Sequence, residues 1–116
     1  MAVANVLAEW TVADFDGALA WCARLFGRTA DRRLMDGLAE WQLTDTGGVP
    51  VFHSPNNAGT GLLTLSVDDL PRHHADLAAR DLSVGDITTG EQARFATVTD
   101  SDGNTITFAE LLTAGT

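Results

Sequence analysis

The feature that most constrains the fold of this chain is an internal repeat. Displaced by 55 residues, the segment LAEWTVADFDGALAW, from Leu7, aligns with LLTLSVDDLPRHHAD, from Leu62. Both copies contain an alternating strand pattern, then Val-x-Asp, then a large apolar residue that opens a helical pattern. Similarity at one fixed offset indicates two copies of one supersecondary unit. The sequence therefore predicts two similar modules.

In the first module, the helical pattern has clear start and stop signals. Asp14 is placed to cap a helix whose apolar residues recur at helical spacing, and Gly27 suits the position that ends it. Three strand patterns follow, at residues 29–35, 38–44 and 49–54.

The second module repeats this order. Asp68 or Asp69 is placed to cap its helix, and Pro71 lies near the first helical position, where its missing N–H is harmless. The strand patterns that follow are at residues 83–89, 94–100 and 105–112.

These patterns predict an α+β fold with two βαβββ modules. We expect curved mixed sheets that enclose a cavity, with the helices outside. We expect a single domain over residues 1–116, with module one at about 1–54, a linker rich in turn formers at about 55–60, and module two at about 61–116.

Composition narrows the choice of partners. The net charge of −9 argues against nucleic acid and anionic membranes and favours a cationic ligand. The one cysteine, Cys22, allows no intrachain disulfide, and no run approaches 18 apolar residues. The N-terminal residues lack the basic and apolar regions of a signal peptide. We therefore expect a cytoplasmic protein.

The stretch DSDGN, from Asp100, resembles a calcium loop at first sight. Counted from Asp100, however, position 6 is Thr105 and position 12 is Leu111, where a calcium loop requires Gly and Glu. The flanking runs are rich in β-branched and aromatic residues. Asp-Gly between two such runs predicts a hairpin turn.

Three segments, WTVADFDGALAWCARLFG, LTLSVDDL and DSDGNTITFAEL, together with the βαβββ repeat, resemble the glyoxalase/bleomycin-resistance/extradiol-dioxygenase superfamily, also called vicinal oxygen chelate proteins. The resemblance covers nearly the whole chain. It implies the fold, but the family includes isomerases, dioxygenases, thiol transferases and proteins that only bind drugs.

The resemblance also implies where a metal would be held. Enzymes of the family carry His, Gln or Glu at four cavity-facing positions, which align with Leu7, Leu62 and Thr107 and, with no sharp motif, near Val51. None of these side chains is a metal ligand of the family's usual type. We therefore expect no metal, no cofactor and no catalytic residue at these positions.

Alternation along strands assigns further residues to the cavity. If Leu7 and Leu62 face it, so do Glu9 and Thr64, and Glu9 is either an anchor for a cationic ligand or a charge at a strand end. Thr107 is expected on the cavity face. Glu110 is expected on the opposite face, as a solvated charge.

Three other side chains have two interpretations each. His53 either points toward the cavity mouth or lies on the surface, and Trp41 either stacks on an aromatic ligand or fills the core. Cys22 lies in the apolar stripe of the helix and is interpreted as an inert buried thiol.

The expected ligand-binding residues are Leu7, Glu9, Trp41, Val51, His53, Leu62, Thr64 and Thr107. The preferred hypothesis is a metal-free protein of the bleomycin-resistance type that sequesters a cationic drug or metabolite. One alternative is a lyase, isomerase or dioxygenase of the same superfamily that uses non-standard ligands. The other is a structural dimer module without catalysis. We expect a homodimer.

Overall fold

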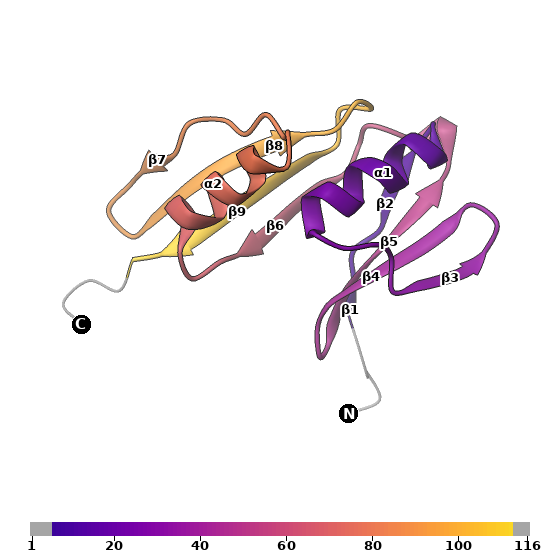
Figure 1. Cartoon of the computed structure of the whole chain (residues 1–116), viewed down its shortest axis with the longest axis horizontal. Coiled ribbons are helices and arrows are strands. Elements are labelled where there is room, and N and C mark those ends of the chain that lie inside the picture. The colour runs from indigo at the N-terminus through magenta and orange to yellow at the C-terminus, as the bar shows by residue number, and fades with distance from the viewer. Residues whose placement is uncertain (1–5, 113–116) are drawn as a thin grey trace. The chain divides into compact units, whose positions relative to one another are not determined.

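The computed structural model describes residues 6–112. The chain divides into two compact units, and each is described by itself (Figure 1). The first comprises Met1–Gly61 and Asp100–Asn104, and the second comprises Leu62–Thr99 and Thr105–Thr116. The border between Gly61 and Leu62 falls at the end of the expected linker. The organisation as a single domain stays a prediction.

The first unit contains one mixed sheet and one helix. Its elements are β1 (Val6–Leu7), β2 (Trp10–Val12), α1 (Phe15–Phe26), β3 (Arg32–Met35), β4 (Leu38–Thr44) and β5 (Gly47–His53). β1 and β2 both pair with β5 in parallel, β5 pairs with β4, and β4 pairs with β3, the last two in antiparallel fashion. A short 3-10 helix, Pro55–Asn57, follows β5.

The second unit repeats this arrangement. Its elements are β6 (Leu62–Ser66), α2 (Leu70–Ala79), β7 (Thr88–Thr89), β8 (Ala93–Thr99) and β9 (Thr105–Leu111). The strand order is β6-β9-β8-β7, with β6 and β9 parallel and the other pairs antiparallel. The predicted α+β fold with two βαβββ modules is confirmed.

Both helices begin where the sequence predicts, and α1 also ends there. The side chain of Asp14 accepts a hydrogen bond from the Gly17 N–H at 3.1 Å, and Gly27 ends α1 in the left-handed region with φ 75°. Asp69, rather than Asp68, caps α2 by accepting from the Arg72 N–H at 3.1 Å. Such caps satisfy helix-end groups that have no partner within the helix.

Each helix covers one face of the sheet in its own unit (Figure 1). Beneath α1, the core is formed by side chains that are at most 3% exposed: Trp10, Val12, Cys22, Leu25, Ala39, Trp41, Val49 and Val51. Beneath α2, the corresponding residues are Leu70, Leu77, Ala96, Val98, Ile106 and Phe108. The prediction that Cys22 is buried is confirmed.

The DSDGN stretch forms the turn between β8 and β9, as predicted. Asp100 uses one carboxylate oxygen to accept from the N–H groups of Asp102 and Asn104, and the other to accept from Trp10 Nε1 at 3.0 Å. Asn104 is fully buried, and Gly103 adopts φ 100°. The carboxylate oxygens of Asp100 therefore accept hydrogen bonds from N–H groups within the protein.

Two strand predictions were too long. The predicted strand at residues 83–89 reduces to Thr88–Thr89, and the one at residues 29–35 begins at Arg32. The first strand pattern is divided into β1 and β2, and Ala8 and Glu9 lie between them. Within the described part of the chain, no helix is long and apolar enough to cross a membrane.

Candidate functional site

The second sheet has one covered face and one open face. Paired residues on adjacent strands share a face, and side chains alternate along each strand. Thr107 pairs with Thr64 and Thr97, so these three share a face, whereas Ile106 and Phe108 lie buried under α2. Thr107 therefore lies on the face opposite the helix, and its expected place in a ligand-binding cavity stays a prediction.

The open face of the second sheet combines apolar and hydroxyl groups. Three large apolar side chains lie on it with high exposure: Leu62 at 85%, Leu111 at 73% and Phe95 at 42%. The hydroxyl side chains around them are those of Thr64, Ser66, Thr97, Thr99, Thr105 and Thr107. This surface can contact an apolar group and donate or accept hydrogen bonds at the same time.

Glu110 lies on the helix side, but it is not a solvated charge. Its Oε1 accepts from the Leu70 N–H at 2.7 Å, and its Oε2 lies 3.3 Å from Arg94 Nη2. The Glu110 side chain is only 14% exposed. The expectation of a solvated charge was wrong because the carboxylate reaches the first turn of α2, whose N–H groups favour an anion.

The first sheet also has an open face, which its register defines. Leu7 in β1 pairs with Gly48, and Trp10 in β2 pairs with Val51. Both short strands are therefore offset by 41 residues from β5, on either side of the break between β1 and β2. The same offset aligns Glu9 with Pro50. Leu7 is 48% exposed, and its pairing places it on the face opposite Trp10. Glu9 is exposed and lies in the break between the strands, so its place on that face stays a prediction.

Two of the expected ligand-binding residues lie on the other face. Val51 pairs with Trp10, and Trp41 pairs with Val49, so both belong to the core side. Each is 0% exposed, and Trp41 Nε1 donates to the Arg28 carbonyl oxygen at 2.9 Å. The core interpretation of Trp41 therefore describes its position. The family alignment implied that Val51 and Leu7 lie on the same face of the sheet. The register places them on opposite faces.

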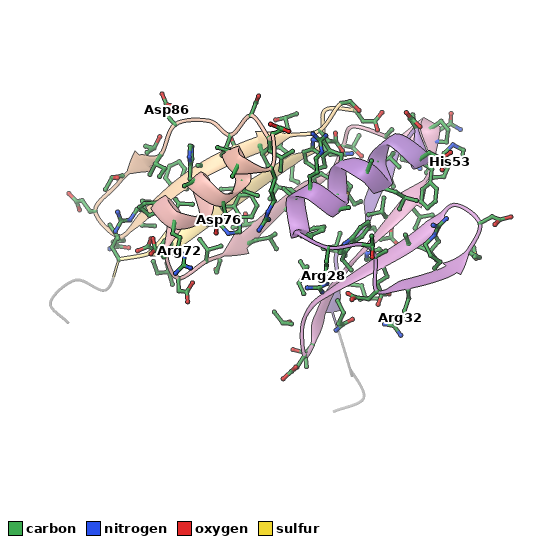
Figure 2. All side chains as sticks on the ribbon, in the orientation of Figure 1. Arg28, Arg32, His53, Arg72, Asp76 and Asp86 are labelled. Atoms are coloured by element: carbon green, nitrogen blue, oxygen red, sulfur yellow. The ribbon has the colours of Figure 1, made fainter. Side chains whose placement is uncertain are left out.

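His53 ends β5 and is exposed (Figure 2). Its backbone N–H donates to the Gly37 carbonyl oxygen at 2.8 Å. By alternation it lies on the Val51 side of the sheet, not on the Leu7 side. A role of His53 in ligand binding stays a prediction.

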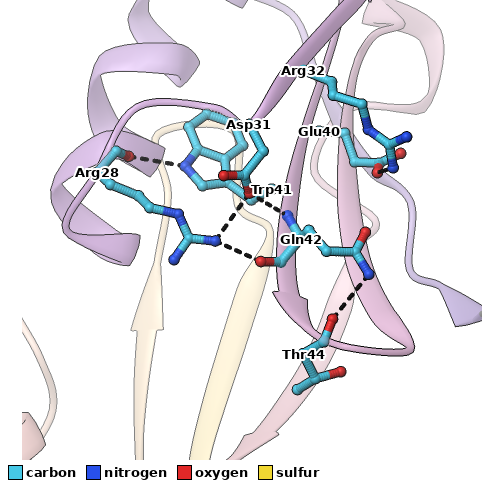
Figure 3. Close-up of polar contacts among 7 residues, drawn as sticks. All are labelled: Arg28, Asp31, Arg32, Glu40, Trp41, Gln42 and Thr44. Carbon is cyan, nitrogen blue, oxygen red and sulfur yellow. Dashed lines mark hydrogen bonds and ion pairs between the residues drawn. The ribbon is translucent and has the colours of Figure 1, made fainter.

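The sequence interpretation overlooked Glu40 on the open face. Glu40 pairs with Pro50 and Arg32, and Gln42 pairs with Gly48, so both side chains lie on the side opposite Trp41. Glu40 is 3% exposed and forms an ion pair with Arg32 (Figure 3). Alternation within LAEWQL could have revealed it, because a core position for Trp41 turns both neighbours to the other face.

A polar network attaches the segment that links α1 to β3 onto the neighbouring strand β4 (Figure 3). Arg28 Nη2 donates to Asp31 Oδ2 at 2.9 Å and also to the Gln42 carbonyl oxygen. The Gln42 N–H donates to the same Asp31 oxygen at 2.6 Å. The Arg28 guanidinium, and next the Gln42 N–H, hold the pKa of Asp31 below its usual range. This network keeps β4 in place beside the open face.

Two hollows lie within single units. One, of about 960 Å³, lies at the start of α2 and is lined by Asp69, Arg72, His73 and Asp76, among others; Figure 2 labels Arg72 and Asp76. The other, of about 460 Å³, lies between α1 and the chain that leads into β3, and Trp41 forms part of its wall. Ser66, at the end of β6, lines the larger hollow and also lies on the open face of the second sheet.

Comparison with solved structures decides the family. The chain superposes with a TM-score of 0.87 and 30% identity on a glyoxalase/bleomycin resistance protein from Catenulispora acidiphila, over 93% of this chain and 98% of the other. The chain belongs to the glyoxalase/bleomycin resistance protein family. No protein-family model matches the chain, and no curated protein matches it in sequence.

Two more distant structures share the fold of this chain. An antibiotic binding protein from Streptomyces sp. CB03234 is 21% identical with a TM-score of 0.75, over 97% of this chain and 99% of that one. A bleomycin-binding protein complexed with bleomycin is 19% identical with a TM-score of 0.70, over 91% and 97%. At these identities the likeness shows the fold alone.

In this chain, the side chains at the positions where the family resemblance implies metal ligands do not fit a divalent cation. Leu7 and Leu62 have no lone pair to donate, and Thr107 offers only a neutral hydroxyl. Among residues 6–112, no group of three or more His, Cys, Asp and Glu side chains is placed to hold a metal ion. No reaction step is therefore derived through a metal at these positions.

Proposed function

We propose that this protein binds a small cationic molecule on its open sheet faces without a metal. One observation carries the proposal. The five exposed large apolar side chains of the described residues all lie on these two faces: Leu7, Met35, Leu62, Phe95 and Leu111. Apolar exposure concentrated on particular faces marks a surface that binds something.

The residues beside these apolar groups support a ligand with polar groups. Thr64 and Thr107 are directly paired on the open face of the second sheet, and Thr97 extends their row. A row of hydroxyls next to Leu62 would orient a ligand whose apolar part covers that side chain.

Charge supports a cationic ligand. The chain carries a net charge of −9, the Glu40 carboxylate lies on the open face of the first sheet, and the Glu9 carboxylate is expected there. An acidic surface raises the local concentration of a cation. Two proteins of the same fold, an antibiotic binding protein and a bleomycin-binding protein, bind small molecules, which supports a small-molecule ligand here.

The test is calorimetric titration with metal-free bleomycin in the presence of EDTA, together with the melting temperature. The proposal expects binding that persists in EDTA, weakens with salt and raises the melting temperature. Leu62→Lys should weaken binding about 10-fold or more, because burial of a leucine contributes roughly 1.5–3 kcal/mol. Ala79→Lys, an exposed site on α2 with the same change of charge, should bind like the wild type.

Three results would contradict the proposal. The first is no heat and no change of melting temperature with bleomycin at millimolar concentration. The second is binding that requires a divalent metal. The third is equal affinity of Leu62→Lys and Ala79→Lys, which would place the ligand elsewhere.

A further inference from the structure

Glu40 is a buried carboxylate on the open face of the first sheet, and its cross-strand neighbour Pro50 is buried too. Glu40 is 3% exposed, whereas Leu7 on the same face is 48% exposed. A buried charge is costly unless another group pairs with it. The identity of that group therefore determines what Glu40 can do.

The group that pairs with Glu40 is the guanidinium of Arg32. Arg32 lies directly opposite Glu40 in the β3–β4 ladder, and its Nη2 donates to Glu40 Oε1. The two partners differ sharply in exposure, because the side chain of Arg32 is 55% exposed and that of Glu40 is 4% exposed. β3 is also the last strand in the order of its sheet. Arg32 thus reaches from the sheet edge over a buried acid.

This asymmetry makes Arg32 the replaceable member of the pair. If Arg32 turned away, its guanidinium would enter water at little cost, since an exposed Arg already keeps much of its hydration. Glu40 would retain the full cost of an unpaired buried charge. A second guanidinium in the same place would remove that cost, so one cation can replace the other with a small net change.

A second acceptor lies on the same face beside Glu40. Gln42 Oε1 is buried and has no hydrogen-bond partner among the residues that the structure describes, while Gln42 Nε2 donates to the Thr44 carbonyl oxygen. Figure 3 shows Gln42 and Glu40 on the same side of β4. A Cβ on Gly48 would lie 3.1 Å from Gln42 Oε1 and 3.1 Å from Leu7 Cδ2. The unpaired acceptor thus lies close to an exposed apolar side chain.

We propose that Glu40 recognises a guanidinium or amidinium group of the ligand, and that Arg32 is an internal occupant which the ligand displaces. The planar cation donates a fork of N–H groups that matches a carboxylate. Gln42 Oε1 accepts from a further N–H, and Leu7 covers the apolar part of the ligand. This inference rests on the proposed function, for which it names the recognition residue and the cation class.

The first experiment needs no knowledge of the natural ligand. Arg32→Ala removes the internal guanidinium and leaves room for a free one. Methylguanidinium at 20 mM should raise the melting temperature of Arg32→Ala by several degrees. Methylguanidinium should change the melting temperature of the wild type and of the Arg32→Ala/Glu40→Gln double variant by less than one degree. Tetramethylammonium, which has no N–H donor, is the matched cation and should have no effect on any of them.

Arg32→Gln serves as a second variant if Arg32→Ala does not fold, since it keeps a long neutral side chain at the sheet edge. Equal responses of the single and double variants to methylguanidinium would overturn the inference. So would equal responses of Arg32→Ala to methylguanidinium and tetramethylammonium.

The second experiment separates this inference from the proposed function. Benzamidine and neutral benzamide are titrated into the wild type, Arg32→Ala and Glu40→Gln, with ligand NMR as the readout. Benzamidine should bind Arg32→Ala at least 10-fold more tightly than the wild type and should not bind Glu40→Gln, whereas benzamide should not distinguish the three.

If bleomycin binds the wild type but benzamidine fails to distinguish the variants, the proposed function stands and the Glu40 assignment falls. If bleomycin fails to bind while both tests with amidinium and guanidinium succeed, the cation site stands and the proposed function on the apolar faces falls.

Discussion

Asn104→Ala should remove the side chain that joins the β8–β9 turn to the rest of the first unit. Asn104 is 0% exposed. Its Nδ2 donates to the Thr11 carbonyl oxygen at 2.7 Å and to Asp100 Oδ2 at 2.9 Å, while its Oδ1 accepts from the Gly61 N–H at 2.7 Å. Alanine would leave each of these partners without that hydrogen bond.

The three bonds give the expected magnitude. A hydrogen bond contributes about 1 kcal/mol net, and a buried group left without a partner costs about 1–3 kcal/mol. Two of the three partners are backbone groups that no other part of Asn104 can reach. The free energy of unfolding should therefore fall by about 3 kcal/mol. With a urea m-value near the lower end of the usual range, roughly 1–3 kcal/mol/M, the midpoint should fall by about 2 M.

The assay is urea unfolding at 25 °C, followed by tryptophan fluorescence and by circular dichroism. Asn56→Ala is the matched control, because Asn56 is an exposed asparagine in the short 3-10 helix. It should lower the free energy of unfolding by less than about 0.5 kcal/mol.

Equal midpoints for the two variants would refute the reasoning. A fall in the m-value of Asn104→Ala at an unchanged midpoint would also refute it, because the turn would then open separately from the rest of the protein.

Three further predictions concern titration and packing. Burial, and next the negative charge of Asp100, raises the pKa of the Cys22 thiol to about 12. Iodoacetamide at pH 8 should therefore label Cys22 only in unfolding urea, and native labelling at the rate of free cysteine would contradict this. Burial, and next the charge of Arg80, lowers the pKa of His73, so the unfolded chain binds the proton more readily. Stability should be fully present above about pH 6.5 and fall as the pH drops through the folded pKa; His73→Gln should flatten that slope, and an unchanged slope would disprove the assignment. Val51→Ala should lower the free energy of unfolding by about 2 kcal/mol and Leu7→Ala by less than 1 kcal/mol, because only Val51 is buried. The reverse order in urea unfolding would overturn the strand register.

Local signals predicted the elements well. The fixed offset between Leu7 and Leu62 predicted two modules, and the Asp caps with Gly27 placed the helices correctly. These signals work because a cap, a turn and an apolar stripe are each encoded within a few residues. The strand at residues 83–89 was overpredicted, because β7 depends on pairing of Thr88 and Thr89 with β8 rather than on an alternating pattern of its own.

The face of the first sheet on which each side chain lies was harder to predict. It depends on the register between strands that are far apart in the sequence. The family alignment placed Val51 with Leu7, but the pairing offset places Pro50 and Phe52 on the Leu7 side. A shift of one residue in the alignment is enough to exchange the two faces of a strand. In the second sheet, alternation within TITFAE sufficed, because Ile106 and Phe108 identify the helix side without reference to another strand.

The two carboxylates that the sequence interpretation missed or misjudged differ in a way that bears on function. Both are largely buried and paired with an arginine, but Glu110 also accepts from the N–H of Leu70 at the start of α2. Glu110 therefore has a structural role at the start of α2, whereas the described contacts of Glu40 join it to Arg32. A buried ion pair is often no more stable than apolar residues of the same size. Stability alone thus accounts for Glu110 and leaves Glu40 without a reason, unless its charge is used to bind a cation.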